Sequence, residues 1–474
     1  MVHDLLFYEL LLAVLLWLGV HAYMHWQRGL ATKQPPAQRT TRAPQAPKPF
    51  AGLTQKPHCA ACEQGPERAD QLPPSPPPLL VPKRGRPRMV RDTSGHYCPQ
   101  KTCAYYGWAG QGNLRANGHP SGGPWRQFQC VACHTYFLET HGTLFAGKRV
   151  SAELLVQVIA ALAEGLGIRA VARVFGIDPN TVLTWLSAAA DQLEAFSHYL
   201  LRDVHINHVQ LDELFAWVSE DTVGRGSTAK ASEPCQHSPH WIWVAIDPVS
   251  KLLLAIDVGE RTLAMAQRLV HRVLQVLAPG CLPLFLTDGL KEYATALLTH
   301  RGHWVPRPRR RVPGPTPKPR WMPRADLLYA QVVKQYRRRR LVRMSPRVVF
   351  GTLERVRHIL APQGWQINTA FIERVNLTLR HHVAAAGRRV ITVAKSASGL
   401  RSQLLLYHAY YNFCLPHASL RGPVAHPQPT HGTGSAKRWR PCTPAMAAGL
   451  TARVWSVREV LLFRVPPWPQ PEGL

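Results

Sequence analysis

Hydrophobic patterning predicts most of the elements in the central part of the chain. Short apolar runs bounded by turn residues are typical of strands. Such runs lie at 208–217, 241–247, 251–258 and 282–287. In other segments, apolar residues recur at helical spacing. The helices expected from this spacing are 153–165, 168–186, 262–277, 291–300 and 368–380.

The segment 168–186 has the signals of a helix, a turn and a second helix. Gly176 lies at the turn, Asp178 can cap the second helix, and Pro179 takes its first position. A helix-turn-helix presents its second helix to the major groove of DNA. The residues expected to face the groove are Asn180, Thr181 and Thr184. An ordinary helical hairpin is the alternative interpretation.

The order of the predicted elements indicates a mixed α/β domain. The predicted order is three successive strands, a helix and then an inner strand that ends at Asp288. This is the order of a ribonuclease-H-like fold. Asp212 and Glu213 lie at the end of the first strand. Because side chains alternate along a strand, we expect only one of the two to face a bound cation, and we choose Asp212. An acidic pair that simply ends a strand in solvent is the alternative.

The helix 368–380 supplies a third carboxylate. Glu373, Asn376 and Arg380 share one face of that helix at spacings of three and four residues. A carboxylate with polar and basic neighbours can hold a metal ion and steer a phosphate. Mg²⁺ takes oxygen ligands and retains waters, so a few carboxylates are enough to hold it. A surface helix with a charged face is the alternative.

Four cysteines have the spacing of a zinc-binding module. Two pairs, CxxxxC and CxxC, are separated by 26 residues, which is typical of a four-thiolate zinc ribbon. These cysteines are Cys98, Cys103, Cys130 and Cys133. The aromatic residues expected in the small core of this module are Trp125, Phe128, Tyr136 and Phe137. A module that positions DNA and a purely structural zinc site both fit the pattern.

The first residues of the chain form an apolar segment. Residues 5–24 are long enough to span a bilayer. Basic residues follow the segment, so a spanning helix would keep the rest of the chain in the cytoplasm. Glu9 lies inside the segment and is costly in lipid. A leucine-rich helix used for self-association or docked on the core fits equally well, so both interpretations stay open.

Residues 28–92 are rich in proline and basic residues, which predicts a linker. Within it, Arg84 and Arg86 form an RGRP sequence similar to an AT-hook, in which two arginines lie in a narrow A·T minor groove. A solvated basic linker is the alternative. Cys59 and Cys62 form a lone CxxC, which is a weak signal for a metal site.

The charge of the chain favours a polyanionic partner. Its 57 Lys and Arg against 28 Asp and Glu give a net charge of +29, which fits nucleic acid or an anionic membrane. The hydrophobic content of 46% supports packed cores and excludes a disordered basic tail. Residues 301–347 contain fifteen Lys or Arg and one acidic residue, Asp326. This composition predicts a phosphate-contacting insertion or, alternatively, a disordered basic loop. The arginine runs are Arg309, Arg310 and Arg311, and Arg337, Arg338, Arg339 and Arg340.

Together these motifs resemble the bacterial insertion-sequence transposases of the DDE class, specifically the zinc-ribbon type typified by insertion sequence one. The matching text is CPQKTC, CVAC, the helix-turn-helix at 168–186, VQLDELFAWV, FLTDGLKEY, NTAFIERVNLTLR and YYNFCLPHASL. Residues 443–461 are similar to the closing segment of such proteins. The resemblance covers roughly 95–461. The hydrophobic N-terminus, the proline-rich linker and the basic insertion depart from the family pattern.

The resemblance implies a DNA transposase that cleaves strands at element ends and transfers them into target DNA. It implies two Mg²⁺ or Mn²⁺ ions held by Asp212, Asp288 and Glu373. It also implies one Zn²⁺ ion held by Cys98, Cys103, Cys130 and Cys133. The expected partners are double-stranded DNA and further copies of the chain in a homodimer or larger assembly. The expected location is the cytoplasm, at the nucleoid.

A catalytically inactive DNA-binding or regulatory protein, tethered to a membrane through residues 5–24, is the alternative function. A membrane protein whose basic domain binds anionic lipid is a third. The three acidic residues favour the transposase. The domains expected are a hydrophobic segment at 1–27, the linker at 28–92, the zinc ribbon at 93–150, the helix-turn-helix at 151–203, a ribonuclease-H-like catalytic domain at 204–425 with the basic insertion 301–347, and a C-terminal tail at 426–474.

Overall fold

The computed structural model describes residues 74–80, 93–218, 240–307, 318–338, 340–387, 392–428 and 435–470. All of them belong to one compact unit, Lys56–Leu474. No helix within these ranges is long and apolar enough to cross a membrane. Several residues with a predicted function lie outside the described residues. These are the apolar run 5–24, Cys59, Cys62, Arg84, Arg86, Arg309, Arg310, Arg311 and Arg339.

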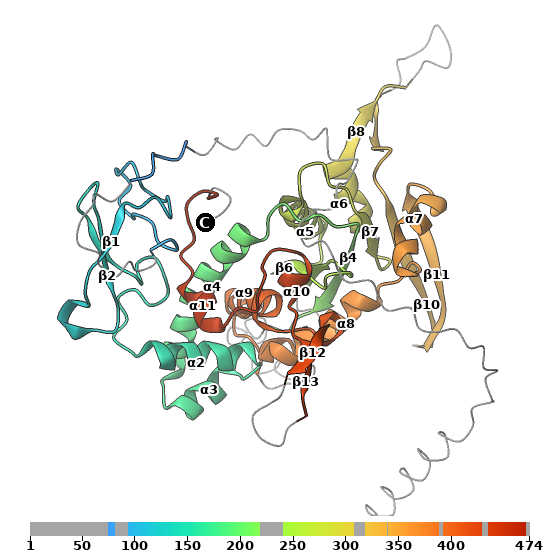
Figure 1. Ribbon diagram of the computed structural model, residues 1–474. Helices are drawn as coiled ribbons and strands as arrows, with labels where there is room; N and C mark the ends of the chain where they lie inside the picture. Colours follow the sequence, from blue (N-terminus) through green and yellow to red (C-terminus); the bar gives the residue numbers. More distant parts are fainter. Residues whose placement is uncertain are drawn as a thin grey trace, which may run out of the picture. The chain divides into compact units, whose positions relative to one another are not determined.

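The largest sheet of the described chain is a six-stranded mixed sheet in the spatial order β11-β10-β7-β4-β5-β6 (Figure 1), which we call the central sheet. The strands β4, β5 and β6 pair antiparallel, whereas β7 is parallel to β4 and β10 is parallel to β7. The strand β11 forms an antiparallel hairpin with β10. The bounds are β4 His208–Phe215, β5 Trp241–Ile246, β6 Leu253–Gly259, β7 Leu284–Thr287, β10 Tyr329–Arg337 and β11 Arg340–Phe350. The four strands predicted from hydrophobic patterning are confirmed as β4 to β7.

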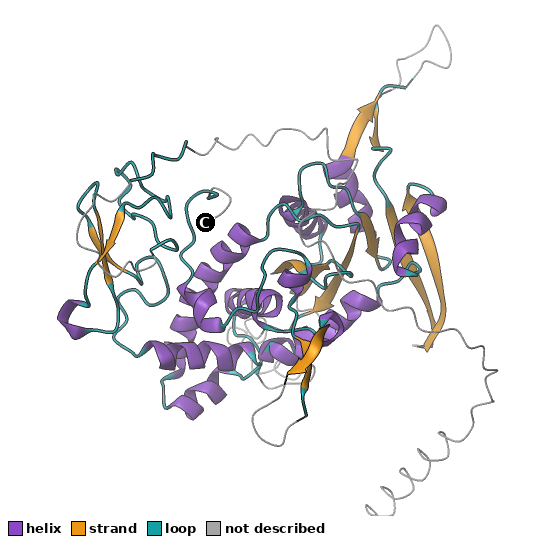
Figure 2. Cartoon of the chain, viewed as in Figure 1, coloured by secondary structure: helices purple, strands orange, loops and turns teal. Residues whose placement is uncertain are grey.

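Helices cover both faces of this sheet (Figure 2). Along β4, Val209 and Leu211 pack on one face against α5 and α6, whereas Leu214 packs on the other face with α8 and α9. Leu286 of β7 packs with α7. The bounds are α5 Leu263–Val276, α6 Glu292–Arg301, α7 Leu353–Leu360, α8 Ala370–His382 and α9 Ala397–Ala409. With both faces covered, the ends of the strands are the places left for polar side chains.

Three helices precede the sheet, α2 at Ala152–Ala163, α3 at Ile168–Phe175 and α4 at Pro179–Leu200. Gly176 ends α3 with a φ of 65°, a left-handed conformation that glycine adopts without a steric penalty. Asp178 begins α4 by accepting a hydrogen bond from the backbone N–H of Asn180 at 2.8 Å. The predicted succession of helix, turn and second helix is therefore present in these residues.

A separate three-stranded antiparallel sheet, in the order β1-β2-β3, carries Cys130 of the predicted zinc module on β2, and Cys133 follows in the turn between β2 and β3. The strands are β1 Leu114–Ala116, β2 Gln127–Cys130 and β3 Tyr136–Leu138. Phe128 and Phe137 pack in its small core, as predicted. The prediction was wrong for Tyr136, which is 55% exposed because it alternates with Phe137 on β3. It was wrong for Trp125 also, whose ring packs instead on Phe145 at 5.6 Å.

The basic segment 301–347 is not a single insertion. The strands β8, Gly302–Val305, and β9, Arg320–Pro323, form one hairpin. The strand β10 is an inner strand of the central sheet, and its Tyr329 and Ala330 are fully buried. Most of the described part of the segment is therefore β-structure and not a disordered basic loop. Its exposed arginines near the β10–β11 turn are Arg337, Arg338 and Arg340.

The described residues after 435, expected to be a tail, pack onto the rest of the chain. The ring of Phe196 on α4 contacts Phe413, Trp455 and Phe463, with ring centroids 4.9, 5.6 and 5.3 Å away. Arg464 is buried, and its Nε donates a hydrogen bond to the backbone carbonyl of His141 at 2.7 Å. His141 belongs to the predicted zinc module at 93–150, which we call the cysteine module. The C-terminal segment thus packs on both α4 and the cysteine module.

The remaining elements are short. The strands are β12 Gly422–Gln428 and β13 Lys437–Arg440, and the helices are α10 Pro444–Ala447 and α11 Val457–Leu462. The 3-10 helices are η1 Pro120–Gly122, η3 Ala361–Gln363, η4 Ala384–Ala386 and η6 Ala418–Leu420, and η5, Tyr410–Cys414, is a π-helix.

Replacing Phe196 tests the packing of the C-terminal segment. We expect Phe196→Ala to lower the free energy of unfolding by about 3–5 kcal/mol, because a fully buried ring is removed and a cavity remains. Denaturant unfolding of the full chain would measure the change. Leu377→Ala, at a position 59% exposed, is the control, and we expect it to stay within about 0.5 kcal/mol of wild type. Equal stability of the two variants would contradict the packing of this aromatic cluster.

Candidate functional site

Asp212 and Asp288 lie side by side at two neighbouring parallel strands: Asp212 lies within β4, which continues to Phe215, whereas Asp288 directly follows the last residue of β7. The expectation that the first strand ends at Asp212 and Glu213 is therefore wrong. In the register of β4 and β7, Leu211 is opposite Thr287. Asp212 follows Leu211 on β4, and Asp288 follows Thr287 just after β7, so the two aspartates lie side by side. Their carboxylates and that of Glu213 supply oxygen atoms that all lie within 4.8 Å of one another. We call Asp212, Glu213 and Asp288 the acidic cluster.

The presence of Glu213 in this cluster corrects the expectation from strand alternation. Alternation does turn Asp212 and Glu213 to opposite faces of β4. However, β7 pairs with β4 only as far as Leu211 and ends at Thr287. No strand therefore lies between Glu213 and Asp288. The side chain of Glu213 is only 1% exposed. Its carboxylate accepts hydrogen bonds from Arg261 Nε at 2.9 Å and from the Tyr293 hydroxyl at 3.1 Å, which hold it in place.

The helix α8 contacts the acidic cluster through Asn376. Its Nδ2 donates a hydrogen bond to Asp212 Oδ2 at 2.7 Å. Glu373, one turn earlier on α8, is half-exposed and forms an ion pair with Lys334 of β10. Glu373 also accepts a hydrogen bond from the Thr369 hydroxyl at 3.2 Å. The structure therefore brings Asp212 and Asp288 together but leaves Glu373 outside the cluster, paired with a lysine.

Burial raises the pKa of Asp212 to about 7, and the charges of Asp288 and Glu213 contribute to the rise. Burial and the charge of Asp288 also raise the pKa of Glu213, against the opposing effect of Arg261. Carboxylates that share a site repel one another until a proton or a cation reduces their charge. Because Mg²⁺ and Mn²⁺ prefer carboxylate oxygens, the donor set of the acidic cluster fits a divalent cation.

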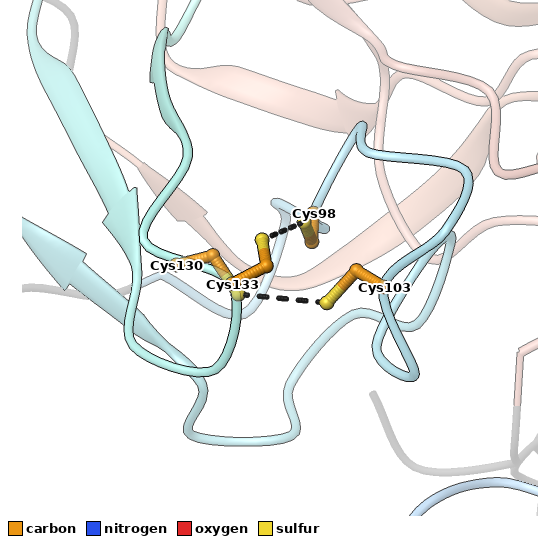
Figure 3. A group of neighbouring side chains, drawn as sticks. All are labelled: Cys98, Cys103, Cys130 and Cys133. Carbon is orange, nitrogen blue, oxygen red and sulfur yellow. Dashed lines mark hydrogen bonds between the residues drawn. The ribbon is translucent and has the colours of Figure 1, made fainter.

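The four predicted zinc ligands converge in the structure (Figure 3). Cys98 Sγ lies 3.6 Å from Cys133 Sγ, and Cys103 Sγ lies 3.9 Å from Cys130 Sγ. Both separations far exceed the roughly 2.05 Å of a disulfide bond. Tetrahedral zinc with Zn–S bonds of about 2.3 Å places its sulfur ligands about 3.8 Å apart. The number, chemistry and spacing of these cysteines therefore fit one Zn²⁺ ion.

Polar groups next to the cysteines favour thiolates at part of this centre. Asn113 Nδ2 donates a hydrogen bond to Cys130 Sγ at 3.4 Å. Burial acts to raise the pKa of Cys133, but hydrogen bonds with Thr135 and with the neighbouring thiols lower it to about 7. Burial raises the pKa of Cys98. A bound Zn²⁺ ion deprotonates a coordinating thiol outright, and so would overcome that effect of burial.

The residues predicted to contact DNA differ in their exposure. On α4, Asn180 and Thr184 are exposed and Thr181 is half-buried. The exposed arginines predicted on the β10–β11 hairpin are Arg337, Arg338 and Arg340. On α8, Asn376 is buried against the acidic cluster, and Arg380 donates a hydrogen bond to a backbone carbonyl at 3.2 Å. These two side chains therefore have contacts within the protein.

Sequence reasoning missed three residues that surround the acidic cluster. Arg261 and Tyr293 contact Glu213, but they come from distant segments and no local motif marks them. Lys334 was one of fifteen basic residues in 301–347. If β10 had been recognised as an inner strand, Lys334 would have stood out from the other basic residues, because the alternation of side chains then assigns it to one face of the sheet.

The cysteine centre predicts roughly one zinc ion bound per chain, because four thiolates complete the tetrahedral shell. We expect Cys133→Ser to lose most of that zinc and to unfold at a lower temperature, since the ion holds the small module together. Elemental analysis and thermal unfolding of the full chain would measure both effects. Cys442→Ser is the control, because Cys442 lies outside the group of four. Full zinc content in Cys133→Ser would contradict the assignment.

The raised pKa of Asp212 predicts a pH-dependent stability in the absence of divalent cations. In the unfolded chain this carboxyl titrates at about 4, whereas in the folded chain its pKa is about 7. Between these values the folded state holds a proton that the unfolded state has lost. Stability contributed by this group is therefore lost as the pH rises through that interval.

Thermal unfolding in chelator would test this effect. Over the interval from about pH 5 to about pH 8, we expect Asp212→Asn to lose less stability than wild type. Mg²⁺ at the upper pH should raise the unfolding temperature of wild type more than that of the variant. Asp326→Asn, which alters an exposed acid, should follow wild type. Parallel pH profiles for all three proteins would contradict the raised pKa.

No protein-family model matches the chain, and no curated protein matches it. Among solved structures, it is similar to a crystal structure of the Mos1 strand transfer complex, with 14% identity and a TM-score of 0.13 over 31% of this chain and 53% of that chain. It is also similar to a crystal structure of the Mos1 mariner paired end complex with Mn, with 15% identity and a TM-score of 0.13 over 32% of this chain and 57% of that chain. The chain thus spans just over half the length of these structures, and similarity at this level carries no argument about function.

Proposed function

We propose that this chain is a DNA transposase that cleaves strands at the ends of a mobile element and joins them to target DNA. The observation that carries the proposal is the meeting of Asp212, on β4, with Asp288, which directly follows the adjacent parallel strand β7. The sheet supports it, because three antiparallel strands followed by two strands parallel to the first is the arrangement expected of a ribonuclease-H-like domain.

In this proposal, Asp212, Asp288 and Glu373 hold two divalent cations, Mg²⁺ or Mn²⁺. Such cations lower the pKa of an attacking water or 3′-hydroxyl and stabilise the departing oxygen. Asn376 donates a hydrogen bond to Oδ2 of Asp212 and so fixes the orientation of that carboxylate. The buried carboxylate of Glu213 adds negative charge beside the cations. Glu373 joins the set after it separates from its lysine partner.

Three further parts of the chain contribute to DNA binding in this proposal. The helices α3 and α4, within 151–203, form a helix-turn-helix whose second helix presents Asn180, Thr181 and Thr184 to the major groove. The four cysteines hold Zn²⁺ in a zinc ribbon at 93–150, which positions the reading helix on the element end. The exposed arginines of the β10–β11 hairpin contact phosphates.

The proposed reaction also determines the partners. Two element ends must be brought together with target DNA, so a homodimer or larger assembly at the nucleoid belongs to the proposal. Membrane attachment through residues 5–24, minor-groove contact by Arg84 and Arg86, and a metal site at Cys59 and Cys62 stay predictions.

A non-catalytic DNA-binding protein is the second candidate function. The ion pair between Glu373 and Lys334 favours it, because the pair keeps the third carboxylate out of the acidic cluster. A regulator that kept the fold for DNA binding alone would have no need to break this pair.

Strand cleavage separates the two candidates. The purified chain would be incubated with a duplex that carries the DNA flanking its own coding sequence, with Mg²⁺ or Mn²⁺. We expect metal-dependent cleavage and joining, reduced at least roughly a hundredfold in Asp288→Asn, because that substitution removes a cation ligand. Asp326→Asn should cleave as wild type does.

Two outcomes would decide against the transposase. One is tight, salt-sensitive DNA binding without cleavage by wild type, which would favour the non-catalytic protein. The other is cleavage that Asp288→Asn retains in full, which would place the reaction elsewhere in the chain.

A further inference from the structure

Lys334 lies on the same face of the central sheet as the two aspartates. Leu286 of β7 is paired with Gln210 on one side and with Ala330 on the other. Counting in steps of two from these paired residues leads to Asp212, to Asp288 and to Lys334. Three neighbouring parallel strands, β4, β7 and β10, therefore place two carboxylates and one ammonium group on one face of the sheet. The helix α8 covers this face, since the amide of Gln210 bonds to its first turn.

The contacts of Lys334 connect it to the acidic cluster. Its ammonium group forms an ion pair with Glu373, and its side chain is 25% exposed. Its positive charge lowers the pKa of Asp212, against the larger effect of burial. By contrast, Arg261 is bound to Glu213 by two of its nitrogens on the opposite face of β4. Lys334 therefore faces the cluster from the side of α8.

Two of the carboxylates at this site already have cationic partners. Glu213 is paired with Arg261 and Glu373 with Lys334, whereas Asp212 and Asp288 form no ion pair with any residue that the structure describes. A divalent cation bound at the cluster would attract the carboxylate of Glu373 and repel the ammonium of Lys334. Lys334 would then need another anionic partner. A DNA phosphate bound to the divalent cation could be that partner. Lysine is a common ligand of phosphate groups, to which it acts as a point charge.

We propose that Lys334 binds a phosphate of the DNA at the acidic cluster, and that Glu373 exchanges Lys334 for a divalent cation when the DNA enters. This inference rests on the proposed function, because it requires DNA at the cluster. In the absence of DNA and metal, Lys334 and Glu373 neutralise each other. With both bound, each has an opposite charge of its own, so the ion pair breaks without leaving either side chain unpaired.

Metal binding by the DNA-free chain tests the exchange. Calorimetric titration of the zinc-loaded full chain with Mn²⁺ would be compared for wild type, Lys334→Met and Arg357→Met. We expect Lys334→Met to bind Mn²⁺ roughly tenfold more tightly, because the substitution removes the positive charge that competes for Glu373. Arg357→Met removes an exposed positive charge on α7 and should bind Mn²⁺ as wild type does. Equal Mn²⁺ affinity in Lys334→Met and wild type, or no Mn²⁺ binding at all, would overturn the exchange.

DNA binding tests the phosphate contact. Fluorescence anisotropy would use a labelled duplex with the DNA that flanks the coding sequence, with Ca²⁺ in place of Mg²⁺ and at fixed salt. We expect Lys334→Met to bind this duplex at least roughly fivefold more weakly than Arg357→Met does. Lys334→Arg should recover most of the loss, because it restores the positive charge. Equal affinities for Lys334→Met and Arg357→Met would overturn the phosphate contact.

These measurements separate this inference from the proposed function. Neither titration requires strand cleavage, and thermal unfolding would show that each variant is folded. A chain that meets both binding expectations but never cleaves DNA would refute the transposase and leave the role of Lys334 supported. A chain that cleaves DNA while Lys334→Met behaves like Arg357→Met would refute the role of Lys334 alone.

Discussion

The carboxylates of the acidic cluster are close together because β7 ends where β4 continues. After Thr287 the chain leaves the sheet, so Asp288 stands next to Asp212 without a further strand between them. Their mutual repulsion and partial burial favour a proton or a cation at this point. The surrounding contacts reduce the same charge, since Asn376 donates a hydrogen bond to Asp212 and Arg261 pairs with the third carboxylate. The topology of two strands thus determines the electrostatics of the whole region.

The sequence predicted those features that depend on neighbouring residues. The strands β4 to β7 followed from short apolar runs, and the turn between α3 and α4 followed from Gly176, Asp178 and Pro179, whose effects act within a few residues. The cysteine centre was predictable because the residue type and the spacing together specify tetrahedral thiolate ligation. Asp212 and Asp288 were predictable as partners, because each belongs to an apolar run that forms an inner strand of one sheet.

The remaining features depend on contacts between distant segments. Alternation correctly separates Asp212 from Glu213, but it carries no information on where the neighbouring strand ends, so the approach of Glu213 was not predicted. Because 301–347 is rich in basic residues, its inner strand β10 was not predicted from the sequence, and neither was the position of Lys334 on that strand. The aromatic packing on Phe196 joins α4 to residues near the end of the chain, and no local pattern indicates that contact.

The two candidate metal centres differ in how far the protein completes the surroundings of an ion. Four thiolates fill a tetrahedral shell, so a zinc ion there needs no other ligand and serves the stability of its module. The acidic cluster offers two carboxylates from within β4 and one from the residue that follows β7, while Glu373 remains with Lys334. A cation at the cluster would take its other ligands from water or, in the proposed function, from a DNA oxygen, and it would remain exchangeable for that reason. An ion of the first kind fits a permanent structural role, whereas one of the second kind fits a reaction in which the substrate itself completes the site.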